Sequence, residues 1–583
     1  MLKKTCIFLG GGIFVHENLT ITYWIKEIMN MEICRKTAVI AAVGLFVGAV
    51  YAEVTPTVPT TNIEAASGEL KWTEATWTNG APTETSVIGF EGTTLDLLFD
   101  AKNESSDKTK ATRNFNNIYI GSGQTLNLTV ADGAEMRIYD RNNAFTGAGK
   151  ANSVLNIDTT QNPKGGIVAR LSATNPDDAS GNSGINIKNL TLNISGKDAV
   201  YNEGEIDFAA SCAGANQLFG STVSTRDAAM VIVSSDVNIK GFVKNWGVNR
   251  CRGSFNVLEN SGFYATGNFN AWDPCDVNIA KNAVIWTDGG FNAAGSGASG
   301  KFTSNGLLQI DGAILASSIE RYNVTWATAT FNAGAKINQT AYTTIDETKT
   351  GAVGSYLQKG TTTLNAGIAA DSFEFANRIF LGDGSNLVLK SSNVFSIGGK
   401  KQGASEFFVA GWTFATEGGK TLWAGFTAAN ATINNAVDNE FGTFKFFTGS
   451  TLTLQLDASK TLAIRNMVLM TAEETTMGFA TGTQAAASGD MNIYLSLDDL
   501  GGKTLFFGED IVSAIRNNTI HLFDSTNKTW EFIEGEDYKF VDSDYTFSDG
   551  TVVSGAYVVP EPATYAAIFG ALALGFVAWR RRK

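Results

Sequence analysis

The chain has 583 residues, a formal net charge of −13, and 61 glycines against 8 prolines. Residues 1–52 carry a net charge of +2 and residues 560–583 a net charge of +3, which leaves −18 on residues 53–559. An acidic body of this kind argues against binding nucleic acid or other polyanions by electrostatic attraction. The many glycines, with only 17% charged residues, predict short strands joined by tight turns rather than helices or disorder.

The segment 31–52 has the three parts of a secretory signal peptide. Arg35 and Lys36 precede an apolar stretch, and Val50-Tyr51-Ala52 places small residues where signal peptidase requires them. We therefore predict passage through the Sec translocon and cleavage between Ala52 and Glu53. Residues 1–30 do not fit this pattern, and we interpret them as a mis-annotated upstream start; an unusually long n-region is the alternative.

A stretch with two tryptophans opens the body, and it reads KWTEATWTNGAPTETSVIGF from Lys71. Trp72 and Trp77 are followed by Asn79-Gly80 and Pro82, which are turn signals. The pattern resembles the segment that opens many passenger-like proteins with autotransporter-associated β-strand repeats. We predict that the two tryptophans cap the first coil of a β-stack; stacking against a sugar is the alternative.

A strand–glycine–strand unit recurs along the body. It stands at residues 118–130, 379–389 and 446–456, and each time a short apolar strand and a glycine turn precede an alternating strand. Shorter echoes occur at residues 190–194, 236–239 and 276–279. Degenerate repeats of this kind indicate stacked coils that bury their apolar faces against their neighbours.

This pattern predicts an all-β fold with a β-solenoid over residues 53–497, most simply a right-handed parallel β-helix. Asparagines at inward or corner positions would form hydrogen bonds from coil to coil. A series of antiparallel β-sandwiches is the competing fold, but it would show turn signals at steady spacing within blocks of about 100 residues. The repeating strand pattern ends before residues 498–559. Residues 498–508 and 511–517 could include a short helix, and strand-like segments follow. We predict a capping β region over residues 498–559.

Three cysteines remain after signal removal: Cys212, Cys251 and Cys275. Cys251 and Cys275 could pair in an oxidising compartment, although spacing alone does not decide it. None lies in a C-x-x-C arrangement, so we expect no zinc site. Asp542 and Asp544 could contribute to a calcium site, but the EF-hand ligand pattern is missing, and we predict no metal.

Residues suited to catalysis are sparse. His521 is the one histidine after the signal peptide, and it follows no nucleophile motif, so we interpret it as structural. The densest carboxylates, Asp177-Asp178, Asp498-Asp499 and Asp542 with Asp544, read as solvated turns. We therefore expect no enzymatic activity and no cofactor. Trp246, Trp272 and Trp286 leave sugar stacking open as an alternative to core packing.

The C-terminus has three parts in a fixed order. Pro560-Glu561-Pro562 comes first, then an apolar run from Ala563 to Trp579, then Arg580-Arg581-Arg582-Lys583. The run is about 17 residues, at the lower limit for a transmembrane helix. The four cations favour the cytoplasmic side, so the body would lie outside the cytoplasm.

This order resembles the PEP-CTERM sorting signal of Gram-negative bacteria. The resemblance implies that Pro560, Glu561 and Pro562 are recognised by an exosortase, a membrane protease that processes the tail at or near the motif. It also implies that the protein is then released or attached at the cell surface, often in organisms that make extracellular polysaccharide.

The sequence thus predicts an exported structural protein of the cell surface or extracellular matrix, with extracellular polysaccharide as a conceivable partner. Two alternatives stay open, a carbohydrate-binding adhesin and a β-helix polysaccharide lyase or hydrolase.

Overall fold

The computed structural model divides the chain into two units, Met1–Thr57 and Val58–Lys583. It describes the second unit from residue 58 to residue 561, together with residues 573–574, 577 and 580–581. Gaps in that range lie at residues 66, 84, 102–113, 139, 170–183, 221–228, 272–273, 294–299, 313, 316–320, 323, 341–353, 358, 377, 418–419, 472–473 and 475–488. The predicted signal peptide therefore lies outside the described residues.

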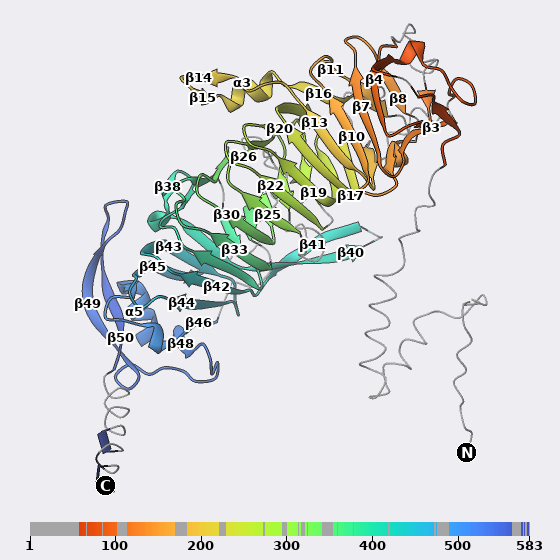
Figure 1. The fold of residues 1–583 in the computed structure, drawn as a ribbon. Coiled ribbons are helices and arrows are strands. Elements are labelled where there is room, and N and C mark those ends of the chain that lie inside the picture. Colours follow the sequence, from red (N-terminus) through yellow and green to blue (C-terminus); the bar gives the residue numbers. More distant parts are fainter. Residues whose placement is uncertain are drawn as a thin grey trace, which may run out of the picture. The chain divides into compact units, whose positions relative to one another are not determined.

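The second unit is a β-helix-like stack in which the strands of each coil pair in parallel with those of the next coil (Figure 1). Three ladders of strands run through the stack, and we call them face 1, face 2 and face 3. Faces 1 and 2 belong to one 32-stranded sheet, because the long strands β17 (Ala229–Lys240) and β19 (Val248–Val257) take part in both ladders. The parallel pairing confirms a β-helix-like body and excludes the antiparallel sandwiches.

Face 1 consists, besides the second halves of β17 and β19, of β2 (Glu69–Lys71), β4 (Thr94–Phe99), β7 (Gln124–Val130), β10 (Ser153–Asp158), β13 (Thr191–Ser195), β22 (Cys275–Ile279), β25 (Lys301–Ser304), β30 (Thr328–Phe331), β33 (Gly360–Leu364), β36 (Ser385–Leu389), β42 (Asn430–Asn435), β44 (Thr451–Leu456), β46 (Met491–Leu495) and β48 (Ile520–Asp524).

Face 2 consists, besides the first halves of β17 and β19, of β1 (Thr61–Ile63), β3 (Val87–Phe90), β6 (Asn117–Ile120), β9 (Phe145–Gly147), β12 (Gly184–Lys188), β21 (Phe269–Asn270), β24 (Phe291–Ala293), β29 (Val324–Trp326), β32 (Gly354–Leu357), β35 (Arg378–Leu381), β39 (Glu406–Val409), β43 (Asn439–Phe446), β45 (Leu462–Leu469) and β47 (Leu505–Gly508).

Face 3 is the separate twelve-stranded sheet of β5 (Asn114–Phe115), β8 (Met136–Ile138), β11 (Lys164–Ala169), β16 (Asn216–Gly220), β18 (Phe242–Asn245), β20 (Gly262–Ala265), β23 (Val284–Thr287), β26 (Leu307–Ile310), β31 (Lys336–Gln339), β34 (Phe373–Phe375), β37 (Phe395–Ile397) and β38 (Lys400–Lys401). Its last strand, β38, is antiparallel to β37, and the 3-10 turn η3 (Gln402–Ala404) follows.

The recurring unit read from the sequence is the passage from face 2 to face 1. Residues 118–130 contain β6 and β7, residues 379–389 contain β35 and β36, and residues 446–456 run from β43 into β44. The echoes at residues 236–239 and 276–279 lie on face 1 two coils apart, in β17 and β22, with β19 between them. Alternation along each strand directs one set of side chains into the stack and the other set outward.

The interior is filled with apolar side chains, and aromatic rings form a row from coil to coil. Phe269 and Phe291 stack with centroids 5.1 Å apart, and Phe291 lies 5.0 Å from Phe302. The row continues through Phe331, Phe373, Phe395, Phe407 and Phe441. All of these side chains are almost fully buried, so they hold neighbouring coils together by burial and by ring contacts.

The N-terminal end of the stack is closed by the predicted tryptophans. Trp72 lies in the 3-10 turn η1 (Trp72–Glu74), with its ring 5.1 Å from that of Trp77, 4.8 Å from that of Phe99 and 5.5 Å from that of Phe115. Trp77 also forms a β-bridge with Ile63 of β1. The two tryptophans therefore pack on the first coils, as the capping interpretation requires.

The C-terminal end is closed by a helix and a hairpin. Helix α5 (Glu509–Arg516) buries Ile511, Val512 and Ile515, which agrees with the short helix expected there. The hairpin pairs β49 (Tyr538–Thr546) with β50 (Val552–Pro560) (Figure 1). Strand β50 also pairs with β47 in antiparallel orientation. The parallel stack continues to β48, past the boundary predicted at residue 497. The polar turn η4 (Leu497–Asp499) that suggested the boundary is a connection between strands of the stack.

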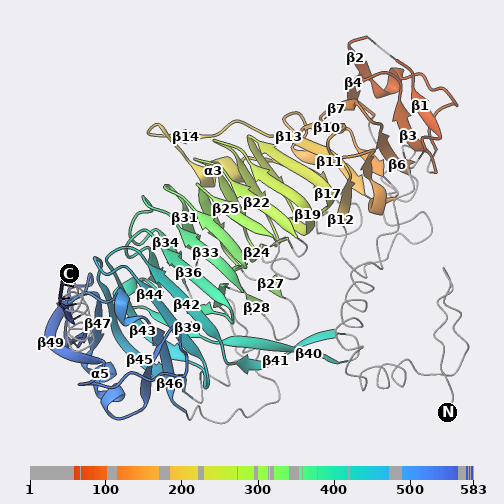
Figure 2. The ribbon, with the colours of Figure 1, turned by 60° about the horizontal axis from the view of Figure 1, so that its bottom comes forward.

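A few short elements lie outside the three faces. They are the 3-10 turn η2 (Arg141–Asn143), the pair β14 (Tyr201–Asn202) and β15 (Glu205–Ile206), helix α3 (Phe208–Ala213), the pair β27 (Ile314–Leu315) and β28 (Arg321–Tyr322), and the hairpin β40 (Gly411–Glu417) and β41 (Lys420–Thr427). Figure 2 shows the β40–β41 hairpin extending away from the stack.

Candidate functional sites: the sorting junction and the outer side of face 1

The predicted sorting motif begins inside the C-terminal hairpin. Pro560 is the last residue of β50 and lies opposite Tyr538 of β49. The backbone N–H of Glu561 then donates a hydrogen bond to the carbonyl of Asp537, at 3.0 Å. The Glu561 carboxylate lies 3.6 Å from the Nζ of Lys539. The first two residues of the motif are thus attached to the folded body, and Lys539 and Asp537 hold the second.

The turn at the other end of this hairpin is fixed by charged side chains of the stack. The buried carboxylate of Glu440, in β43, accepts hydrogen bonds from the backbone N–H of Ser548 at 2.9 and 3.0 Å and also from its hydroxyl. Arg465, in β45, donates to both oxygens of Asp549 at 2.9 and 3.0 Å and lies 4.4 Å from the ring of Phe547. Both bonds from Arg465 come from one nitrogen, Nη2, and charge-assisted hydrogen bonds are stronger than those between neutral groups.

Burial alone would raise the pKa of the Asp549 carboxyl. Hydrogen bonds from Thr551 and Arg465 outweigh burial, so the pKa of Asp549 lies below its ordinary value. The ionised form of Asp549 is therefore the one that the folded hairpin favours.

A continuous ladder of amide side chains runs along the outer side of face 1. In each of six successive coils the Asn Nδ2 donates to an Oδ1 in the preceding coil, at 2.5 to 2.9 Å, in the series Asp96, Asn127, Asn156, Asn193, Asn238, Asn256 and Asn278. Thr303, Thr330 and Thr363 continue the row in register. Hydrogen bonding between amides of neighbouring coils was predicted correctly. Some of it lies at the predicted inward or corner positions, as between Asn292 and Asn270 and between Asn365 and Asn332, whereas the position of this ladder on the outer side was not predicted.

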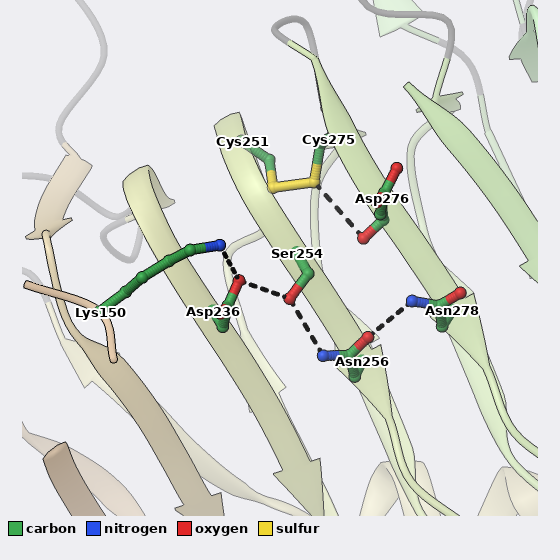
Figure 3. Close-up of a disulfide and its surroundings, with 8 residues drawn as sticks. All are labelled: Lys150, Asp236, Cys251, Ser254, Asn256, Cys275, Asp276 and Asn278. Carbon is green, nitrogen blue, oxygen red and sulfur yellow. Dashed lines mark hydrogen bonds and ion pairs between the residues drawn. A yellow bond between two sulfur atoms is a disulfide. The ribbon is translucent and has the colours of Figure 1, made fainter. Parts of the chain in front are cut away.

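The asparagines point outward because they alternate with inward apolar residues. Asn127, for example, stands between the buried Leu126 and Leu128. Figure 3 shows the neighbouring polar groups on β17, β19 and β22: Ser254 donates to Asp236 at 2.9 Å, and Lys150 approaches Asp236 at 3.3 Å. The outer side of face 1 thus presents regularly spaced amide, hydroxyl and carboxylate groups.

The disulfide question left open by the sequence is resolved. Cys251 of β19 and Cys275 of β22 form a disulfide between adjacent coils, across a sequence separation of 24 residues, and both are buried (Figure 3). Cys212 is buried and unpaired, and burial raises the pKa of its thiol to about 12. A thiol of that pKa is almost wholly protonated at neutral pH and unreactive.

The candidate catalytic residues do not converge. His521 lies on β48, with Nδ1 2.5 Å from Glu531 and Nε2 3.6 Å from Asp490. Asp499 ends η4, and its pKa is raised by burial and by Asp498. Asp542 and Asp544 are exposed on β49. Within the described part of the chain, no group of three His, Cys, Asp or Glu side chains is arranged to hold a metal ion.

Among the tryptophans raised as sugar-stacking candidates, Trp246 and Trp286 are described. Trp286 lies on face 3, where its Nε1 donates to Asp311 at 2.6 Å, and its ring lies 6.1 Å from that of Tyr264. Trp246 precedes β19, and Trp272 and Asp177-Asp178 lie outside the described residues.

Only part of the predicted tail can be placed. Arg580 and Arg581 are helical, whereas Pro562, Ala563, Trp579, Arg582 and Lys583 lie outside the described residues, as do Ala52 and Glu53. Among the residues that are described, no helix is both long and apolar enough to cross a membrane. The contact between Lys539 and Glu561 could not be predicted from the sequence, because only the pairing of β49 with β50 brings the two residues together.

Comparison with family models finds the PEP-CTERM protein-sorting motif at residues 558–583. The match begins at Val558, which is also the last residue of β50 that pairs with β47. A motif of this class implies an exported protein that is sorted at the membrane of a Gram-negative bacterium and processed by an exosortase. Comparisons with curated proteins and with solved structures give no match.

Proposed function

We propose that this chain is an exported, non-enzymatic structural protein of the cell surface or extracellular matrix. Segment 31–52 directs it through the Sec translocon, and signal peptidase cuts after Ala52. The run from Ala563 to Trp579 holds the precursor in the inner membrane, with Arg580 to Lys583 on the cytoplasmic side. An exosortase then processes the tail at Pro560-Glu561-Pro562.

The observation that carries this proposal is the sorting motif at residues 558–583. The buried disulfide between Cys251 and Cys275 supports export, since disulfides form and persist in oxidising compartments outside the cytoplasm. Regular coils with apolar interiors and polar exteriors suit an extended structural body. The likeness of the Trp72–Trp77 stretch to autotransporter-associated repeats stays a prediction.

Replacing Pro560-Glu561-Pro562 with three alanines tests the proposal in a host that has the matching exosortase. The variant keeps the apolar run and the basic tail, so it should still insert. Its processing should fail, and the full-length form should accumulate in the membrane fraction. Deleting residues 563–583 should instead send unprocessed protein to the periplasm or medium. If the alanine variant is processed and displayed like the wild type, the motif is not a processing signal.

A second candidate function, a carbohydrate-binding adhesin, is favoured by the outer side of face 1. Its rows of Asn and Thr offer donors and acceptors at the regular spacing of neighbouring strands, which suits the repeated hydroxyls of an extended polysaccharide. Glycan arrays with the purified body test this. Asn156→Ala with Asn193→Ala should weaken binding to any glycan found. Asn338→Ala should not weaken binding, because the hydrogen bond from its side-chain amide to Gln309 lies on face 3. Equal loss in both variants, or no bound glycan, would remove this candidate.

A further inference from the structure

The C-terminal hairpin is held unequally at its two ends. At the turn, Glu440 and Arg465 bind Ser548 and Asp549 through several charge-assisted hydrogen bonds. In the middle, β50 lies between two strands, because residues 555–558 pair with β47 and the whole of β50 pairs with β49. Strand β50 is therefore held by the turn contacts near its start and by two neighbouring strands from Gly555 to Val558.

Beyond Val558 the backbone support weakens, and the packing of the Val559 side chain on the cluster of Ala463, Phe506, Phe547 and Tyr557 is the last apolar contact of the strand with this cluster. Val559 and Pro560 pair with β49 alone, and proline has no N–H to donate to the ladder. Glu561 adds one backbone hydrogen bond, to Asp537, and one ion pair, to Lys539. The Lys539 side chain is 44% exposed, and an exposed ion pair contributes little to stability. Residues 559–561 can therefore separate from β49 while the rest of the cap stays closed.

A protease that binds residues 559–561 as an extended segment would use the same backbone groups that pair with β49. These residues must therefore separate from β49 before the protease can cut next to the motif. We propose that the folded body governs its own tail processing. The cap protects the chain through Val558, and separation of residues 559–561 from β49, opposed by Lys539, exposes the motif to the protease. In the cleavage step, water adds to the carbonyl carbon that precedes the cut peptide bond, and the C–N bond breaks. The body keeps a new carboxyl terminus, and the tail leaves with a new amino terminus.

This inference rests on the proposed function and adds two statements to it. First, the processed protein keeps β50 from Val552 through Val558, so the cap of the stack survives the cut. Second, Lys539 is a positioning residue that sets how often the motif is exposed, without itself being part of the recognised motif.

The test follows tail loss by pulse-chase of the full chain in a host with the matching exosortase, with intact-mass analysis of the product. Lys539→Glu, which repels Glu561, should raise the processing rate about twofold to fivefold, the range an exposed ion pair supports. Lys539→Arg should restore the wild-type rate. Lys503→Ala, at an exposed lysine on a loop of the stack, is the control for lost charge and should process at the wild-type rate. Melting temperatures of all variants should agree, because the ion pair is weak.

A wild-type product ending at or after Val559 supports the inference. A product ending within Val552–Val558, or a Lys539→Glu rate equal to that of wild type, overturns it while leaving exosortase processing intact. If the wild type loses no tail at all, the proposed function itself fails, and this inference falls with it.

Discussion

The two ends of the stack are closed by different chemistry. At the N-terminal end, the rings of Trp72 and Trp77 cover the first coils, on Phe99 and Phe115. At the C-terminal end, a hairpin is laid across β47 and fixed through charged groups at its turn. An apolar plug only has to exclude water, whereas a strand cap also leads the chain out of the fold in a defined direction. The end that carries the sorting motif is the one closed by a strand.

The C-terminal cap also protects the open strand edge at the end of the stack from pairing with another chain. Its outer strand, β49, carries Lys539, Asp542 and Asp544, and charged side chains on an edge strand discourage pairing with another chain. A cap that survives processing would therefore keep the released or attached body from associating end to end.

The largest expected effect comes from weakening the middle of the stack, which serves as a reference for both ends. Cys251→Ala with Cys275→Ala removes a cross-link over 24 residues and should cost about 3 kcal/mol in the free energy of unfolding, because the unfolded chain gains freedom. Urea denaturation measures this. Hydrogen exchange at the hairpin and at Trp72 should not change. An unaltered denaturation midpoint would mean that the disulfide is absent from the exported protein.

Trp72→Ala breaks the N-terminal closure. The side chain is half-buried against three aromatic rings, so its loss should cost about 2.5 kcal/mol, somewhat less than removal of a fully buried tryptophan. Trp530→Ala is the matched control, since Trp530 is 56% exposed, and it should change stability by less than about 0.5 kcal/mol. Equal effects of the two substitutions would show that Trp72 does not cap the stack.

Glu440→Ala opens the C-terminal closure. It removes the charged acceptor of the Ser548 N–H and hydroxyl, and losing hydrogen bonds to a charged group should cost about 2 kcal/mol. Amide hydrogen exchange should rise at residues 547–551 and stay unchanged at the N-terminal end. Glu536→Ala, at an exposed position before β49, should leave exchange as it is. Exchange that rises at both ends after Glu440→Ala would mean that the ends are not independent.

Arg465→Lys should have the smallest effect on stability. It exchanges two hydrogen bonds to Asp549 and the contact with Phe547 for a single point charge, at a cost of about 1 kcal/mol. The lowered pKa of Asp549 gives this pair a pH dependence. Its contribution is present above the ordinary carboxyl pKa of 3.8 and is lost as the pH falls through the lower folded value. Exchange at the hairpin turn should therefore increase in acid, and less so in Arg465→Lys.

The sequence predicted the coils well and their closure only in part. The strand–glycine–strand units and the two tryptophans gave correct predictions, because both signals are local. The outward direction of Asn127 follows from its place between Leu126 and Leu128, but the outer ladder was not predicted; the inward and corner pairs, such as Asn292 with Asn270, were. Strand β19, which lies between the echoes at residues 236 and 276, was not recognised from the sequence. Its matching residues, 254–257, read SFNV, whereas both echoes read DVNI.

Other features had no local signal. Ser548 lies 108 residues beyond Glu440, and only the fold brings them together. The same holds for Lys539 and Glu561, which meet because β49 and β50 pair, and for Cys251 and Cys275, whose partner choice depends on the register of neighbouring coils. The sorting motif was readable because its order along the chain is itself the signal.

The central claim is that the tail is a processing signal read by an exosortase. The most direct measurement expresses the unaltered full chain in a Gram-negative host without an exosortase, with and without the co-expressed enzyme, and records the intact mass of the protein in each fraction. We expect a membrane-bound form that retains residues 562–583 in the first case and a shortened form that retains β50 at least through Val558 in the second. Equal masses in the two strains, whether shortened or not, would contradict the account.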